Sequence, residues 1–100
     1  MTFDQIFSDI NLIANTKERK STQELALKAG EEVGELQEAV LSATHAPGCG
    51  YKNKTWDDVD EEAVDVIIIS LATALKGAGS LERLKPIFER KMAKWQEKLG

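Results

Sequence analysis

Residues 63–75 form an apolar segment of thirteen residues in which Asp65 carries the only charge. The segment is too short to span a membrane, but it is long enough for more than three turns of helix. A helix that is apolar on every side is normally buried on every side. A domain of 100 residues has a small core, so one side of this helix would face solvent unless another chain covers it. We therefore expect an all-α domain that assembles as a homo-oligomer.

The rest of the chain predicts three more helices and no division into separate domains. Thr2 with Gln5, and Ser21 with Glu24, have the spacing of capping boxes at helix starts. Each pair precedes apolar residues at the helical period. The sequence therefore predicts helices that begin directly after residues 2 and 21, within a single domain over residues 1–100.

Turn-forming residues mark the remaining helix ends. Residues 46–54 contain Pro, two Gly and Asn, which predicts a loop after the second helix. Thr55 is the expected cap of the third helix, and Gly77 and Gly79 are expected to end it. A fourth helical region follows residue 80, and Pro86 is expected to break or kink this region near its start.

Four acidic residues form two pairs with helical spacing. Glu32 and Glu35 lie in the second helix, and Glu62 and Asp65 in the third. Residues three apart share a helix face. At about 100° per residue, Glu32 falls inside the apolar arc of its helix and Glu35 at the edge of that arc. The arc is expected to consist of Leu25, Ala29, Val33, Leu36, Ala39 and Val40. Both acidic pairs are therefore predicted to face the inside of the domain.

Two further acids of the second helix, Glu31 and Glu38, fall on the polar face with Glu24 and are expected to be solvated. The four inward carboxylates need positive charge between them, because buried carboxylates are costly unless they are paired or bind a metal. A hard divalent cation fits oxygen ligands, which predicts Mg²⁺, with Mn²⁺ as an alternative ion. The alternative is a set of salt bridges to Lys28, Arg90 or Lys91.

The charge distribution limits the kinds of partner. The net charge of −4 argues against general binding of nucleic acid, which needs a basic face. No apolar run reaches the length of a membrane span, and the mixed N-terminus does not resemble a signal peptide, so we expect a cytoplasmic protein. Basic residues gather in the last fifth of the chain, where they form either a solvated face or a binding surface for phosphates. They are Arg83, Lys85, Arg90, Lys91, Lys94 and Lys98.

Two stretches carry a family resemblance. Residues 27–36 read LKAGEEVGEL and residues 62–65 read EAVD. Together they resemble the EExxE and ExxD signature of MazG-like nucleoside triphosphate pyrophosphohydrolases, over most of the domain. The resemblance implies a four-helix MazG-like bundle, completed by a partner chain in a homodimer or homotetramer. It also implies Mg²⁺-dependent cleavage of a (deoxy)nucleoside triphosphate into its monophosphate and pyrophosphate, in control or cleaning of the nucleotide pool.

The resemblance assigns roles residue by residue. The metal ligands would be Glu32, Glu35, Glu62 and Asp65. Glu31 matches the first Glu of the motif and would act beside Glu32 in catalysis, as a ligand of a second metal or as the base that orients water. Residues 88–91 are similar to the basic segment that ends the fold. Apart from the resemblance, basic residues near the predicted metal site are expected to bind phosphate, and these are Lys28, Arg90, Lys91 and Lys94.

Two alternatives remain. Phosphoribosyl-ATP pyrophosphohydrolase of histidine biosynthesis shares the fold and a similar acidic pattern. That family usually has a Tyr-His pair soon after the Asp, where this chain has three Ile at residues 67–69. A non-enzymatic helical interaction module would use the acids to meet basic residues of a partner, but such a face has no need of a lone Asp65 in an apolar helix.

Two aromatic residues are candidates for stacking on a base. Trp56 and Tyr51 flank the end of the loop that enters the third helix. An aromatic side chain there can close on a nucleotide that is held by its phosphates. The sequence does not predict which base or sugar is preferred.

Overall fold

The computed structural model describes residues 1–78 and 80–100, without the side chains of Tyr51 and Ala78. It contains the helices α1 (Phe3–Thr16), α2 (Thr22–Ala43), α3 (Trp56–Ala78) and α4 (Leu81–Lys98), with a short 3-10 helix η1 (Gly50–Lys52) between α2 and α3. No strand occurs in these two ranges, so the predicted all-α class with four helices is confirmed.

Both predicted capping boxes are present. The Oγ1 atom of Thr2 accepts the backbone N–H of Gln5 at 3.1 Å, and the Thr2 N–H donates to Gln5 Oε1 at 2.7 Å. The corresponding distances between Ser21 and Glu24 are 3.1 and 3.0 Å. These pairs satisfy N–H groups that the first turn of a helix leaves without a partner. Thr55 caps α3 more weakly, since its Oγ1 accepts the Asp58 N–H at 3.4 Å.

The predicted end of the third helix agrees with the structure, and the expected break in the fourth does not. Helix α3 ends at Ala78, next to Gly77, and Gly79 lies outside the described residues. Helix α4 continues through Pro86, so the expected break is not seen in this helix. Proline lies only six residues into α4, and its missing N–H costs a single bond to the carbonyl of Glu82. One proline near the start of α4 therefore did not stop this helix.

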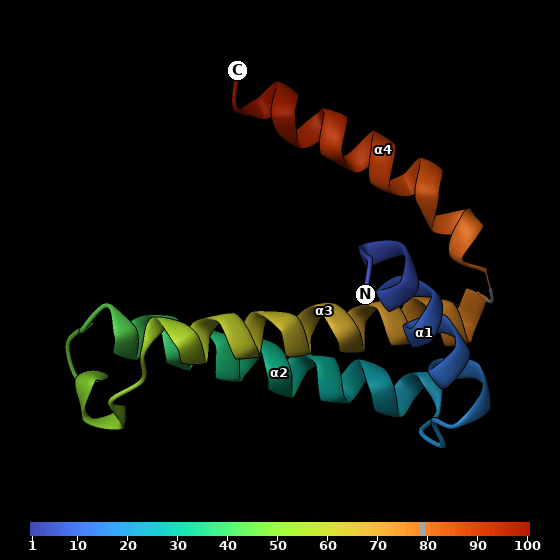
Figure 1. Ribbon diagram of the computed structural model, residues 1–100. Coiled ribbons are helices and arrows are strands. Elements are labelled where there is room, and N and C mark those ends of the chain that lie inside the picture. Colours follow the sequence, from blue (N-terminus) through green and yellow to red (C-terminus); the bar gives the residue numbers. More distant parts are fainter. Residues whose placement is uncertain (79) are drawn as a thin grey trace.

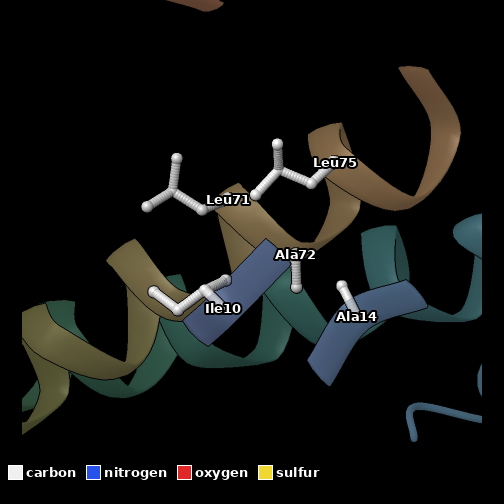
Figure 2. Close-up of a cluster of buried hydrophobic side chains, with 5 residues drawn as sticks. All are labelled: Ile10, Ala14, Leu71, Ala72 and Leu75. Atoms are coloured by element: carbon white, nitrogen blue, oxygen red, sulfur yellow. The ribbon is translucent and has the colours of Figure 1, made fainter. Parts of the chain in front are cut away.

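Helices α2 and α3 form an antiparallel pair that runs side by side along most of its length (Figure 1). Helix α1 packs across the C-terminal half of α3. The buried cluster at this crossing contains Ile10 and Ala14 of α1 and Leu71, Ala72 and Leu75 of α3 (Figure 2). The core therefore lies at the end of the α2–α3 pair where α1 crosses it.

Helix α4 leaves the other three helices and extends away from the α2–α3 pair (Figure 1). It contacts α1, and none of its described side chains is buried. The radius of gyration of the Cα atoms is 15.8 Å, whereas a compact domain of this length has about 13 Å. A single chain thus forms a three-helix unit with a projecting fourth helix, and the predicted bundle is not closed within one chain. Among the described residues, no helix has the length and apolar character needed to cross a membrane.

Candidate metal centre

Three of the four predicted ligands meet between α2 and α3. One carboxylate oxygen from each of Glu32, Glu35 and Glu62 lies within 4.8 Å of the other two. Helix α2 presents Glu32 and Glu35 together because residues three apart share a face, and α3 brings Glu62 opposite them. The antiparallel pairing of the two helices therefore builds an acidic cluster from residues that are distant in the sequence.

Glu32 is the most buried member of this cluster, with 9% of its surface exposed. It lies on the face of α2 that also buries Leu25, Ala39 and Ser42. The apolar face predicted for α2 included Val33, but Val33 is exposed. The buried face of α2 is therefore rotated away from Val33, toward Ala39. Helix α3 packs along α2, and the buried side of α2 carries Ala39 and Ser42.

Two oxygen atoms of the cluster are buried without a hydrogen-bond partner among the described residues. They are Oε2 of Glu32 and Oε2 of Glu62. A buried polar atom without a partner costs free energy, and such atoms are rare in stable proteins unless a ligand satisfies them. These two oxygens are therefore suited to a bound cation.

The electrostatics of the cluster also favour a cation. Burial raises the pKa of Glu62, and its hydrogen bonding with Glu35 and the negative charges of Glu35, Asp65 and Glu32 raise that pKa further. A carboxyl group that is crowded by other carboxylates holds its proton more tightly. A divalent cation between these groups would reverse this effect, because it stabilises the ionised forms.

Lys28 provides part of the positive charge. Its Nζ atom lies 3.3 Å from Glu31 Oε2 and 3.4 Å from Glu32 Oε1. Hydrogen bonds to Glu31 and Glu32 raise the pKa of Lys28. One of the predicted salt bridges thus forms, but it reaches the other oxygen of Glu32 and leaves Glu32 Oε2 and Glu62 Oε2 unpaired.

The donor set fits a hard divalent ion. Mg²⁺ takes oxygen ligands from carboxylates. One oxygen from each of the three glutamates lies within 4.8 Å of the other two, close enough for all three residues to serve as ligands of one ion. Glu32, Glu35 and Glu62 would hold the ion.

Asp65 lies next to this cluster rather than in it. It contributes negative charge at Glu62, so it is close to the cluster, but its side chain is exposed. Within the single chain Asp65 does not face the inside of the domain, and Val64 and Ile68 beside it are exposed as well. It lines a surface depression together with Asp60, Glu61 and Val64.

The two acids assigned to the polar face of α2 are exposed as expected. Glu31 pairs with Lys28, and Glu38 Oε2 lies 3.2 Å from Lys52 Nζ in η1. The catalytic role of Glu31 stays a prediction, since its only described partner is Lys28.

The other predicted binding residues do not meet the acidic cluster within one chain. Arg90, Lys91 and Lys94 are exposed on the projecting part of α4. Trp56 is exposed at the start of α3, on the same helix as Glu62. The side chain of Tyr51 lies outside the described part of the structure.

Two polar residues that were not predicted to have a role hold the connections at the two ends of the α2–α3 pair. The Oγ atom of Ser42, which is buried, accepts the backbone N–H of Lys54 at 2.9 Å and so ties the loop after α2 to that helix. Lys76 donates to the carbonyl oxygen of Glu18 at 2.6 Å and to that of Lys20. The signal for Lys76 was a lone cation at the end of an apolar helix.

A scan of protein families, a search of curated proteins and a search of solved structures each found no match to this chain.

Proposed function

We propose that this protein is a Mg²⁺-dependent nucleoside triphosphate pyrophosphohydrolase of the MazG-like type, which acts as a homodimer or homotetramer. The observation that carries the proposal is the pair of buried oxygens, Glu32 Oε2 and Glu62 Oε2, which have no hydrogen-bond partner in the described chain and come from the two halves of the EExxE and ExxD pattern. A cation held by these carboxylates would satisfy both oxygens, and Mg²⁺ that is bound by one or two carboxylates also binds substrate phosphates in many enzymes.

The chemistry of the proposed reaction follows from the donor set. Mg²⁺ held by Glu32, Glu35 and Glu62 would neutralise charge on the phosphate oxygens of the substrate. Glu31, exposed one residue before Glu32, is available to orient the attacking water. Attack at the α-phosphorus would release pyrophosphate, and this choice of phosphorus comes from the family resemblance alone.

Lys28 would assist at the same site. Its ammonium group already lies between Glu31 and Glu32, so it can turn toward a phosphate oxygen when a cation takes over the charge of Glu32. Asp65, exposed beside the cluster, would complete the ligand set by a rotation of its side chain toward Glu62.

Release of pyrophosphate from a panel of ribo- and deoxyribonucleoside triphosphates, with and without Mg²⁺, tests the proposal. The Asp65→Asn variant should lose activity by orders of magnitude because it removes a charge and keeps the shape. Asp9→Asn, an equally exposed change on α1, is the matched control and should leave activity unchanged. Near-normal turnover by Asp65→Asn, or no pyrophosphate from any nucleotide, would refute the assignment and favour the non-enzymatic module.

A further inference from the structure

Helix α4 is anchored at its start and uncovered over the rest of its length. Leu81 and Leu84 are partly buried and pack against the core cluster where α1 crosses α3. Beyond Pro86 the large apolar side chains are exposed, and the exposed fraction rises from 42% at Ile87 to 63% at Trp95. The part of α4 after Pro86 therefore projects from the other helices (Figure 1).

An open apolar groove of about 590 Å³ lies between α4 and the C-terminal half of α3. Both of its walls carry side chains at the same spacing, four and then three residues apart. Those on α3 are Ala74, Ser70 and Ile67, and those on α4 are Leu84, Phe88 and Lys91. This alternation is the spacing of the seam along which two helices pack together. The two walls thus have the pattern of a packed helix pair, although the groove separates them.

The two walls also match in the size of their side chains. Helix α4 follows α3 along the chain and turns back against its direction (Figure 1). When the helices are aligned with Ala74 opposite Leu84, three pairs along the seam place a small side chain of α3 opposite a large one of α4. These pairs are Ala74 with Leu84, Ser70 with Phe88 and, one step beyond the groove, Ala63 with Trp95. Small side chains opposite large ones let two helices fill the space between them.

The charges of the two helices match in the same alignment. Residues 56–65 of α3 contain six acidic residues and no basic one, and residues 90–98 of α4 contain four basic residues and one acidic one. Lys98 lies opposite Asp60 in this alignment. Lys91 lies opposite Ile67, where its carbon chain can cover the apolar side chain while its ammonium group stays in water. Contact between these segments would therefore reduce the repulsion among the acidic residues of α3.

We propose that α4 is a lid that bends at Pro86 and closes the groove onto α3 of the same chain. Sharp bends in helices occur mostly at proline, and Pro86 has no N–H to bind the carbonyl oxygen of Glu82. In the closed form Phe88 packs on Ser70, and the basic segment of α4 lies along the acidic segment of α3. This closure is a property of the chain that does not depend on the proposed reaction.

Distances between two spin labels on one chain test the closure. In a Cys49→Ser background, the labels are attached at Ile68→Cys on α3 and Ala93→Cys on α4, two exposed positions away from the seam. The labelled chain is mixed with an excess of unlabelled chain, so that pulsed electron paramagnetic resonance measures distances within one chain. A population should appear at the short distance expected for two packed helices, whose axes lie about 8–10 Å apart.

Two variants test the seam and the hinge. Trp95→Glu should abolish the short-distance population, because closure would bury the new charge, and Gln96→Glu on the neighbouring, outward side of α4 should leave it in place. Pro86→Ala restores the N–H and should reduce this population several-fold.

None of these positions belongs to the core cluster, so the three variants should keep the fold. Long distances alone in the parent chain would overturn the closure, and so would a short distance that survives Trp95→Glu. A short distance that is lost on mixing with unlabelled chain would assign the contact to another copy and overturn the proposal as well. An unchanged population in Pro86→Ala would overturn the hinge.

Discussion

Glu32 on α2 and Glu62 on α3 belong to one acidic cluster, and each has a buried oxygen, Oε2, without a hydrogen-bond partner among the described residues. Lys28 lies close to the other oxygen of Glu32. A cation bound by these two glutamates would satisfy both buried oxygens.

The first prediction concerns binding of Mg²⁺ alone. Glu32→Gln should weaken Mg²⁺ binding by roughly 100-fold, because an amide oxygen is a poorer ligand than a carboxylate and the cluster loses a negative charge. Glu38→Gln, an equal change on the exposed face of the same helix, should have little effect. Calorimetric titration with Mg²⁺ measures both. Equal effects of the two changes would show that the cluster is not the binding site.

The second prediction concerns the pH dependence of stability without metal. The pKa of Glu62 in the folded chain is raised above the ordinary value of about 4.5. Between these two values the folded state holds more protons than the unfolded state, so the free energy of unfolding falls as pH rises through this window. Above the raised pKa the penalty remains in full.

Urea unfolding at a series of pH values in metal-free buffer tests this dependence. Glu62→Gln should reduce the loss of stability on the alkaline side, because its neutral side chain does not ionise beside Glu32, Glu35 and Asp65. Addition of Mg²⁺ near neutral pH should stabilise the parent chain more than the variant. A parent chain that gains stability as pH rises through the same window would contradict the assigned direction.

The third prediction separates two roles of Lys28. Lys28→Met removes the positive charge beside Glu32, so stability without metal should decrease while the affinity for Mg²⁺ increases. If Lys28 also binds phosphate, the Michaelis constant for a nucleoside triphosphate should rise in the same variant. Lys17→Met at the end of α1 is the control. A lower Mg²⁺ affinity in Lys28→Met would mean that the salt bridge positions the ligands.

The fourth prediction tests the role of the basic helix. Changing both Arg90 and Lys91 to Ala should raise the Michaelis constant for a triphosphate more than for a nucleotide with fewer phosphates, because charge-assisted phosphate contacts are lost. The kinetics should be measured at concentrations where assembly is complete. Lys85→Ala, near the start of the same helix, serves as the control. Unchanged kinetics on every nucleotide would identify the basic face of α4 as solvated only.

The fifth prediction concerns the core. Leu75 is fully buried where α1 crosses α3, and Leu27 is 75% exposed on α2. Leu75→Ala should lower the free energy of unfolding by roughly 2–5 kcal/mol, from lost burial and the cavity that remains. Leu27→Ala should change it little. Denaturant unfolding of both variants measures the difference, and similar losses would show that the described packing of α1 on α3 is incorrect.

The sequence by itself determined the helices and the acidic pairs. The spacing of Thr2 with Gln5 and of Ser21 with Glu24 fixes two helix starts, because capping depends on side chains only three residues apart. The same local geometry places Glu32 and Glu35 on one face of α2. The length of α4 did not follow from the sequence, since Pro86 lies inside a helix that it was expected to break.

Only the tertiary structure decided which residues are buried. Val33 is exposed and Ala39 is buried because α3 contacts one side of the apolar arc of α2, and no periodicity within α2 reveals where its neighbour lies. Asp65 is exposed for a related reason, since the face of α3 beside it has no covering helix within the chain. The meeting of Glu62 with Glu32 likewise depends on the register of two antiparallel helices, which is set by packing between residues far apart in the sequence.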